Sequence, residues 1–333
     1  MTSKYAAASA NPSGPGDARP TALQIIQDEG LRGKLQDKVF FITGCSSGIG
    51  IETVRALEAT GATIFATARS LDKAKEALGS LVESDRVHLL EMDQNSLASV
   101  RACATKFLSL SKKLHVLIPN AGVMATPEGR TADGFETQFG VNYLAHFLLF
   151  WLLKPALLAS STPAFHSRVV VVSSMAHRHS DVHFDNLNLE GEYDPHKAYG
   201  QSKTALVWAA NEIERRYGGA GLHATSLHPG GIKSGLQVHV PQEMLEHWGK
   251  EPSIMKMWKS PEQGAATTVW AAVAAELEGT GGVYLEDCMV SGPWEPESGW
   301  AGPGYSTWAM DQDKAERLWV KTLSILELED GTD

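Results

Sequence analysis

The strongest indication of the fold is the glycine-rich segment Thr43-Gly44-Cys45-Ser46-Ser47-Gly48-Ile49-Gly50. A short apolar run at residues 38–42 precedes it and is typical of a buried strand, and residues 51–59 follow as good helix formers. Glycines at such a turn let a phosphate approach the backbone, and the helix N-terminus offers free N–H groups and a favourable dipole. The pattern therefore predicts a bed for a dinucleotide pyrophosphate. Its spacing differs from Gly-x-Gly-x-x-Gly and from a P-loop, and a purely structural turn is the alternative.

A second pattern, Tyr199-Gly200-Gln201-Ser202-Lys203, places a phenol and an ammonium four residues apart. Residues 199–216 are rich in helix formers, and on a helix the positions i and i+4 share a face. The chain holds a second match in Tyr193 and Lys197, but Pro195 is expected to break a helix between them. We therefore take Tyr199 and Lys203 as the functional pair. Together with the glycine turn, this pair predicts a redox enzyme with a nicotinamide cofactor.

Charge, cysteine content and the N-terminal residues limit the kinds of protein that this chain can be. The 333 residues carry a net charge of −10 and no concentrated stretch of Lys and Arg, which argues against a nucleic-acid-binding protein. The three cysteines, Cys45, Cys103 and Cys288, are scattered, and this favours a reducing compartment over a disulfide scaffold. No apolar leader follows Met1. We therefore expect a cytoplasmic protein.

Strand and helix patterns alternate along the chain, which is typical of a parallel sheet covered by helices on both faces. The sequence predicts an α/β fold, a doubly wound parallel sheet of about seven strands, in a single domain at residues 21–333. The expected strands are 39–43, 63–67, 87–92, 116–119, 168–173, 223–227 and 282–285, and the expected helices are 48–60, 71–78, 96–110, 134–158, 199–216 and 261–277.

The remaining segments are assigned by composition. Residues 1–20, rich in Ala, Ser, Pro and Gly, are expected to be disordered, and residues 21–34 to form a short extra helix. Residues 137–153 form the longest weakly charged stretch, but Gln138, Asn142 and His146 within it indicate a core helix and not a membrane span. Peripheral membrane contact remains open.

Five polar or glycine landmarks fall at or just after the ends of predicted strands. They are Gly44, Arg69, Asp93, Asn120 and Ser174. Because ligands of open α/β sheets bind outside the carboxyl ends of the strands, these residues are expected to gather around one site.

With these pieces in order, the chain resembles the short-chain dehydrogenase/reductase family in its non-extended, single-domain form with a Rossmann-type sheet. The resemblance covers residues 33–285 and rests on residues 43–50, Asp93, Asn120-Ala121-Gly122, Asn142, Ser174, Tyr199, Lys203, Pro229-Gly230 and Ser234. Residues 173–177 and 141–147 are similar to the retinol-dehydrogenase and WW-domain-oxidoreductase-like subgroup and to fungal specialised-metabolite reductases. Pro119, Gln94 and Ser234 depart from the family pattern, but none of these changes removes a catalytic group.

The resemblance implies a catalytic set of Asn142, Ser174, Tyr199 and Lys203. Tyr199 is the expected acid/base, Ser174 orients the substrate oxygen, Lys203 also binds the nicotinamide ribose, and Asn142 holds a water next to Lys203. An ammonium about 4 Å from the phenol is worth about 4 kcal/mol at an effective dielectric near 20, on the order of 3 pK units, and desolvation opposes this shift. The alternative is a core tyrosine, a capping serine and a solvated lysine.

The end of the second strand, Thr67-Ala68-Arg69-Ser70, bears on the choice of cofactor. It lacks the acidic residue that holds the ribose hydroxyls of NAD, whereas an Arg fork suits a 2′-phosphate. We therefore expect NADP(H), although Arg69 stacking on adenine is the alternative, and Asp93 either contacts the adenine amine or caps a helix. The expected cofactor-binding residues are Gly44, Ser46, Ser47, Gly48, Ile49, Gly50, Arg69, Ser70, Lys73, Asp93, Asn120, Ala121, Gly122, Tyr199, Lys203, Pro229, Gly230, Ile232 and Ser234.

The substrate side is expected in a lid at about 231–261, followed by a C-terminal extension at about 286–333. The lid carries soft and aromatic side chains that suit an apolar pocket or simply the core of the lid: Met244, Leu245, Trp248, Met255, Met257 and Trp258. We expect a lipophilic ketone or secondary alcohol, or an aldehyde and its alcohol, of polyketide, terpenoid, steroid or retinoid type. No metal site is expected, since the His-rich residues 177–183 suit a solvated loop.

Other functions remain open. An isomerase or dehydratase that recycles its cofactor is one alternative, and a non-catalytic NADP-binding scaffold is another. The C-terminal tryptophans Trp294, Trp300, Trp308 and Trp319 are expected to pack on the domain or on an oligomer face. A homodimer or homotetramer is a family expectation.

Overall fold

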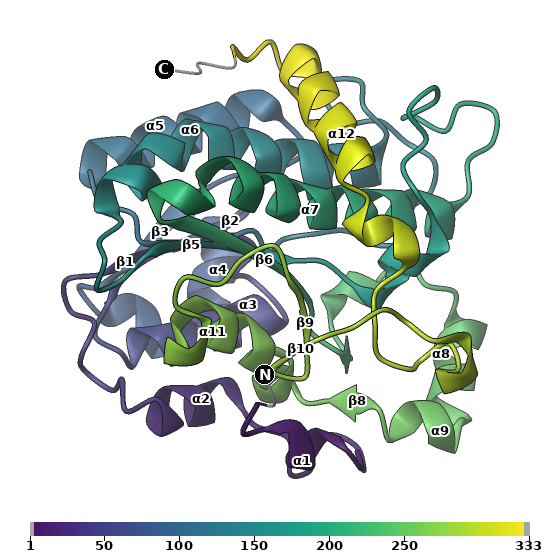
Figure 1. Cartoon of the computed structure of the whole chain (residues 1–333), viewed down its shortest axis with the longest axis horizontal. Coiled ribbons are helices and arrows are strands. Elements are labelled where there is room, and N and C mark those ends of the chain that lie inside the picture. The colour runs from purple at the N-terminus through teal and green to yellow at the C-terminus, as the bar shows by residue number, and fades with distance from the viewer. Residues whose placement is uncertain (1–2, 330–333) are drawn as a thin grey trace.

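A computed structural model describes residues 3–329 of the chain. Its centre is an eight-stranded sheet in the order β10-β9-β6-β5-β4-β1-β2-β3 (Figure 1). The strands are β1 (Val39–Ile42), β2 (Thr63–Ala68), β3 (Val87–Glu91), β4 (Val116–Ile118), β5 (Ser167–Val172), β6 (Leu222–His228), β9 (Tyr284–Glu286) and β10 (Met289–Val290). Seven of these strands pair in parallel and all seven were predicted.

The predicted number of strands was one too low. β10 pairs antiparallel with the end of β9. The turn between them is made by Asp287 and Cys288, which have φ of 48° and 56°. Neither is a glycine, the residue that adopts a positive φ most readily, and no strand was predicted after this turn.

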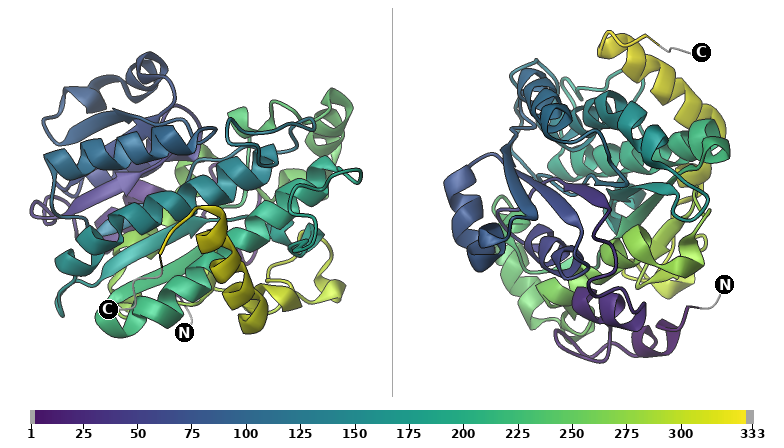
Figure 2. Two further views of the ribbon diagram at one scale, coloured as in Figure 1. Left: turned by 90° about the horizontal axis from the view of Figure 1, so that it is seen from above. Right: turned by 90° about the vertical axis from the view of Figure 1, so that its left-hand side faces the viewer.

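Helices cover both faces of the sheet, as predicted. On one face lie α5 (Leu97–Leu110), α6 (Ala145–Ser160) and α7 (Pro195–Tyr217), and α12 (Gln312–Ile325) packs against α7 (Figures 1 and 2). On the other face lie α2 (Ala22–Asp28), α3 (Ile49–Glu58) and α11 (Ala266–Val273). Phe41 of β1 joins the first apolar cluster and its neighbours Phe40 and Ile42 join the second. Because both faces of β1 are buried, its sequence is a continuous apolar run.

The strand order places the carboxyl end of β1 at a topological switch point. β2 and β3 follow β1 on one side, whereas β4, β5 and β6 lie on the other. The loops after β1 and β4 therefore diverge to opposite sides of the sheet, and the crevice between them is where open α/β sheets bind ligands.

Two helices differ from the prediction in ways that affect the site. α7 begins at Pro195 and not at residue 199, because Asp194 accepts from the amides of His196 and Lys197 and proline is well tolerated in the first turn. Pro195 thus starts the helix, and Tyr193 lies outside it. Before α6 the backbone forms a π-helix, Phe139–Leu144, which contains Asn142. Such π-helical turns occur often at functional sites.

The segment Phe139–Ser160 is the one helix among the described residues that has the length and apolar character to cross a membrane. Ten of the residues of α6 are buried against the sheet and its neighbouring helices. The expectation of a core helix in this stretch is confirmed.

Residues 3–20 are folded, contrary to the disorder expected from their composition. They contain a short helix, α1 (Ala6–Ser9), and they bury the side chains of Tyr5 and Arg19 to 6% and 4% exposure. Residues 1 and 2 of the expected tail lie outside the described residues. Three carbonyl oxygens that accept from Arg19 lie more than 230 residues away in the sequence, so composition does not reveal them.

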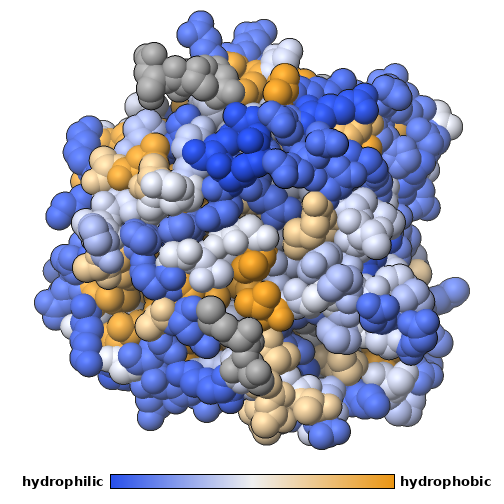
Figure 3. All heavy atoms as spheres, viewed as in Figure 1, coloured by the Kyte–Doolittle hydropathy of each residue, from blue (hydrophilic) through white to orange (hydrophobic). Residues whose placement is uncertain are grey.

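The segments predicted as a lid and a C-terminal extension flank the carboxyl edge of the sheet, and these two names are kept for them below. The lid consists of a two-stranded sheet, β7 (Gly231–Ile232) with β8 (Trp258–Lys259), and the helices α8 (Gln242–Lys250) and α9 (Pro252–Met255). In the extension, a helical turn at Thr307–Met310 leads into α12, whose Trp319 is buried in the core. On the face drawn in Figure 3, hydrophilic side chains predominate and apolar ones form small, separate groups.

Candidate active site

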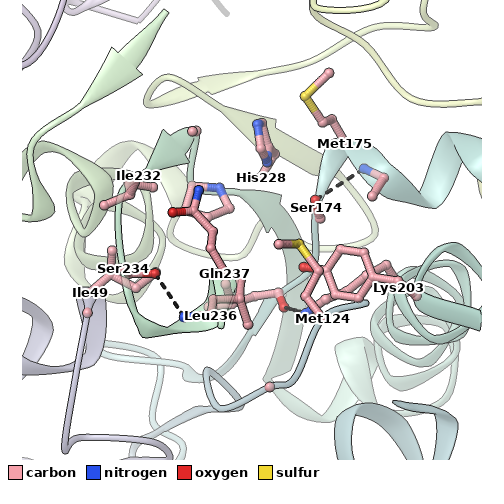
Figure 4. Close-up of a pocket in the computed structure, with 18 of the residues that line it drawn as sticks. Ile49, Met124, Ser174, Met175, Lys203, His228, Ile232, Ser234, Leu236 and Gln237 are labelled. Atoms are coloured by element: carbon pink, nitrogen blue, oxygen red, sulfur yellow. Dashed lines mark hydrogen bonds between the residues drawn. The ribbon is translucent and has the colours of Figure 1, made fainter. Parts of the chain in front are cut away.

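A cavity of about 660 Å³ opens at the carboxyl edge of the sheet. Figure 4 shows Ser174 and Lys203 on one side of it and Ile49, Ile232 and Ser234 on the other. Most of the predicted site residues line it: Gly44, Ser47, Gly48, Ile49, Gly50, Asn120, Ala121, Gly122, Ser174, Tyr199, Lys203, Pro229, Gly230, Ile232 and Ser234. The structure thus brings the two sequence patterns, 155 residues apart between Gly44 and Tyr199, into one cavity.

Six predicted residues lie away from the cavity lining. Arg69 and Lys73 are exposed after β2 and in the first turn of α4 (Leu71–Leu78), and Ser70 caps that helix by accepting from the Lys73 amide at 3.4 Å. Asp93 accepts from the amide of Asn95 at 3.0 Å, which shapes the loop after β3. Ser46 is half-buried in the glycine turn. Asn142 is fully buried and is described below.

Glycine is required at two positions of the turn after β1. A Cβ at Gly50 would lie 2.2 Å from the Gly44 carbonyl oxygen, and one at Gly44 would lie 2.8 Å from Ala121. Gly44 and Gly48 also have φ of 75° and 64°, in the left-handed region. The backbone is therefore open where α3 begins, and the first amides of that helix have no partners within it. This arrangement fits a dinucleotide pyrophosphate.

The buried hydroxyl of Thr43 connects the ends of β1 and β4. Thr43 Oγ1 accepts from the backbone amides of Asn120 and Ala121, both at 2.9 Å, and lies 2.9 Å from His146 Nε2. His146 Nδ1 lies 2.7 Å from the carbonyl oxygen of Asn142, which can only accept, so Nδ1 carries the proton. Because burial lowers the pKa of His146 to about 4, Nε2 is unprotonated and accepts from the Thr43 hydroxyl.

Asn142 is held directly behind the cavity floor. Its Oδ1 accepts from the Val123 amide at 2.8 Å, and its Nδ2 donates to the Val123 carbonyl and to Ser202 Oγ at 3.0 and 2.9 Å. A Cβ at Gly122 would lie 3.1 Å from Oδ1, so this amide packs directly against Gly122, which lines the cavity. Thr43 and His146 also belong to this arrangement. The sequence analysis named Thr43 only in the glycine turn and His146 only in the core helix, and it did not assign either to the site, although His146 lies four residues after Asn142 on the same helical face.

The predicted catalytic side chains Ser174, Tyr199 and Lys203 come from two elements that pack closely. Tyr199 and Lys203 lie on α7, and Ser174 begins the helical turn Met175–His179 after β5. Gly200 permits this contact, because a Cβ there would lie 2.9 Å from the Cβ of His179 and 2.9 Å from the Ser180 nitrogen. The glycine beside Tyr199 therefore sets how closely the Ser174 loop approaches the phenol.

Burial dominates the ionisation of Tyr199 and Lys203. It raises the pKa of Tyr199 above its usual value, and the hydrogen bond with Ser174 opposes this only in part. It lowers the pKa of Lys203 to about 7. Lys203 Nζ lies 5.4 Å from the phenol ring centre and donates to the Val172 carbonyl at 3.1 Å. We expected Lys203 to lower the pKa of Tyr199. In the protein without cofactor the pKa of Tyr199 is raised instead, because desolvation of the phenol is the largest effect and desolvation also disfavours the charge on Lys203.

Several side chains on the substrate side of the cavity were missed in the sequence. They are Met124, Met175, His179, His196, His228, Leu236, Gln237, Val240 and Trp300. His196 lies one turn before Tyr199 on α7, and its position was hidden by the late predicted start of that helix. Of the expected lid residues, Met244 and Trp248 line the cavity.

The C-terminal extension also contributes to the cavity. Trp300 was expected to pack on the domain or an oligomer face, but it lines the cavity, with its ring 4.4 Å from that of His179. His177 and Arg178 tie the extension down: His177 Nε2 accepts from the Ser306 amide at 3.0 Å, and Arg178 donates to the Gly302 carbonyl at 2.9 Å. Because His177 Nδ1 binds the Ser174 carbonyl at 2.7 Å, its imidazole is used within the fold.

Comparison with known proteins agrees with this geometry. A family model described as short chain dehydrogenase matches residues 38–245. The chain is 54% identical over 325 residues to the short-chain dehydrogenase/reductase prx1 of Penicillium roqueforti, covering 98% of this chain and 95% of that protein. It is 37% identical to human retinol dehydrogenase 11, covering 89% and 87% of the two chains. The Pseudomonas aeruginosa RhlG/NADP active-site complex superposes with a TM-score of 0.60 at 25% identity, covering 77% and 96%.

Replacing Thr43 tests the connection between the ends of β1 and β4. In Thr43→Val, two half-buried amides and the buried His146 Nε2 lose their partner, and we expect the free energy of unfolding in urea to fall by about 1–3 kcal/mol. Thr43→Ser keeps the hydroxyl and is the matched control. Equal stability of the two variants would show that the hydroxyl does not hold the strand ends together.

Replacing Lys203 tests its desolvation. Below pH 7 the lysine is charged in both states, whereas between about 7 and 10.5 only the unfolded chain holds the proton, so rising pH favours the folded state. We therefore expect cofactor-free Lys203→Met to melt at a higher temperature than wild type at pH 6.5, with the difference shrinking by about pH 9.5. The exposed Lys106→Met is the control. If the difference in melting temperature between Lys203→Met and wild type stayed constant from pH 6.5 to 9.5, the lowered pKa of Lys203 would be contradicted.

Proposed function

Because this chain belongs to the short-chain dehydrogenase family, we propose that it is an NADP(H)-dependent oxidoreductase acting on a lipophilic carbonyl compound or its alcohol. The reaction interconverts a ketone and a secondary alcohol, or an aldehyde and its alcohol. The observation that carries the proposal is that Ser174, Tyr199 and Lys203 line the same cavity as the glycine turn. A proton donor and a dinucleotide bed within one cavity are what carbonyl reduction requires.

NADP(H) is favoured by the end of β2. Arg69 is exposed there, and among residues 3–329 it has neither an ion pair nor a hydrogen bond, so its guanidinium is free to hold a 2′-phosphate. Ser70 and Lys73 lie within the following turn. The family relative RhlG, which is solved as an NADP complex, supports the same choice.

When bound, the nicotinamide supplies the hydride for reduction and accepts it in oxidation. Tyr199 then donates the proton to the carbonyl oxygen, and the Ser174 hydroxyl, 3.1 Å from the Ala176 amide, orients that oxygen. A phenol whose pKa is raised by burial is protonated at neutral pH, which suits reduction, whereas oxidation requires the phenolate. Lys203, whose amine is close to half protonated near pH 7, would hold the ribose, with Asn142 behind it.

The substrate side supports a lipophilic molecule. Methionine side chains from three elements, Met124, Met175 and Met244, line the cavity together with Trp248 and Trp300. Flexible thioethers and aromatic rings adapt to bulky apolar ligands. Human retinol dehydrogenase 11, by its name, takes a lipophilic alcohol, and prx1 is fungal. We infer a polyketide, terpenoid or retinoid-like substrate, with fungal specialised metabolism as the setting.

The choice of cofactor is tested by Arg69→Ala. Loss of a charge-assisted contact to phosphate costs about 1.5–3 kcal/mol, so the NADPH dissociation constant should rise about tenfold or more, while that of NADH stays within about twofold. Energy transfer from the protein's tryptophans to the reduced nicotinamide gives both constants. Lys75→Ala, on the exposed side of the same helix α4, is the control. Equal loss of both nucleotides, or no loss of either, would contradict NADP selectivity through Arg69.

The reaction is tested by Tyr199→Phe. Consumption of NADPH with a panel of lipophilic ketones is followed at 340 nm, and kcat should fall about 10²–10⁴-fold while the NADPH dissociation constant changes little. Undiminished turnover in the variant would remove Tyr199 as the proton donor. Tight NADPH binding by wild type without consumption of any carbonyl compound would favour a scaffold or a cofactor-recycling enzyme.

A further inference from the structure

The N-terminal segment and the far end of the lid form one buried polar contact. Arg19 donates to Met257 and Trp258 carbonyl oxygens at 3.0 and 2.6 Å and, more weakly, to that of Lys256 at 3.4 Å. Its guanidinium also binds Asp17 Oδ1 at 2.9 Å. Figure 1 shows this N-terminal segment beside β8 and α9. A single side chain from the beginning of the chain thus holds three consecutive carbonyls of the lid.

Gln263 completes the contact from the other side. Its side chain is 1% exposed, donates to the Arg19 carbonyl at 3.0 Å, and accepts from the amides of Gly16 and Ser260 at 2.8 and 3.1 Å. The side-chain nitrogen of Gln263, Nε2, also donates to Asp17 Oδ1 at 3.1 Å. Both side chains therefore have their hydrogen-bonding groups occupied between two segments about 240 residues apart.

The contact is charged throughout the neutral range. Burial alone would raise the pKa of Asp17, but Arg19 and the amides of Ser13 and Arg19 lower it to about 2. The ion pair of Asp17 and Arg19 is therefore not broken by mild acid. A buried charge pair with this many hydrogen bonds is costly to disrupt from either side.

From Arg19 the contact leads directly to the cavity. Trp258 and Lys259 form β8, which pairs with Gly231 and Ile232 of β7. Lys259 also donates to the Pro229 carbonyl at 3.1 Å and forms an ion pair with Asp287. Gly231, Ile232 and Pro229 line the cavity. A shift of β8 would therefore move these three cavity-lining residues.

The middle of the lid has little other support. Among the described residues of α8 and α9, none is fully buried, although Met244 and Trp248 of α8 line the cavity. A segment with few buried contacts opens locally at low cost in free energy. The lid is consequently held mainly at its two ends, where β7 leaves the sheet and where Arg19 holds β8.

We propose that Arg19 is a positioning residue of the substrate lid, and that residues 14–19 are an anchor on which binding of the lipophilic substrate depends. The substrate part of this proposal rests on the proposed function. Arg19 does not touch the cavity, and it acts through β8 and β7. Without it the lid samples open states, so substrate is bound more weakly while the proton donor and its neighbours stay in place.

The test compares Arg19→Gln with the exposed Arg32→Gln, which removes the same charge outside this contact. Hydrogen exchange followed by mass spectrometry reports on residues 236–257 without any substrate. We expect amides of the lid to exchange about tenfold faster in Arg19→Gln, with β1, β4 and β5 unchanged. Gln263→Met, which keeps Arg19 but removes its neighbour, is expected to act in the same direction.

Kinetics with NADPH and 2-decalone then separate positioning from general destabilisation. The KM for the ketone should rise about fivefold in Arg19→Gln, with kcat within about twofold. Unchanged exchange in the lid of a folded variant, faster exchange in the whole sheet, or a fall in kcat at constant KM would each overturn the proposal. If wild type reduces no ketone, the proposed function fails, and the exchange experiment still decides whether Arg19 anchors the lid.

Discussion

The close approach of the backbone after β1 to the loop after β4 is the constraint on which the site depends. Gly50 lies where a Cβ would be 2.2 Å from the Gly44 carbonyl, and Gly44 lies against Ala121. The Thr43 hydroxyl holds the two strand ends at this distance by binding two amides of the β4 loop. A side chain at Gly44 would push the β1 end away from Ala121. A side chain at Gly50 would collide with the Gly44 carbonyl and fill the space in front of the first turn of α3. Packing within the protein therefore requires these glycines, whether or not a ligand is bound.

The same packing removes water from Tyr199 and Lys203. Both are desolvated on α7 because Gly200 admits the Ser174 loop and because β5 and β6 lie beneath the helix. Each group is consequently driven toward its neutral form, the phenol protonated and the amine close to half protonated near pH 7. A neutral phenol can donate a proton, which supports the proposed reduction of a carbonyl compound at neutral pH.

The sequence predicted those features that depend on local pattern. The seven parallel strands, the glycine turn and the shared helical face of Tyr199 and Lys203 each follow from the period of apolar residues or from backbone requirements. The start of α7 was misplaced, because Pro195 was taken as a helix breaker and not as a first-turn residue capped by Asp194. Arg69 remains a prediction, since its role depends on a phosphate that the chain's own contacts do not report.

The features that sequence reasoning missed depend on contacts between distant segments. Gly14 and Gly16, with φ of 109° and 85°, suggested disorder by composition, yet they form the turn that carries Arg19 to the lid. Trp300 enters the cavity because His177 and Arg178 hold the C-terminal extension, a contact without any local signal. In both cases the contact joins segments that are more than 100 residues apart in the sequence, so no local pattern reports it.

In the proposed reaction a hydride passes within this cavity from a reduced nicotinamide to a lipophilic carbonyl compound, with net turnover. Isotope transfer tests this step: NADPH that carries deuterium at both hydrogens of the reactive nicotinamide carbon is incubated with the enzyme and a lipophilic ketone, and the product is analysed by mass spectrometry. We expect an alcohol that holds one deuterium on the carbinol carbon and an equal amount of oxidised cofactor. A product without deuterium, or one formed while the cofactor stays reduced, would rule out this hydride transfer.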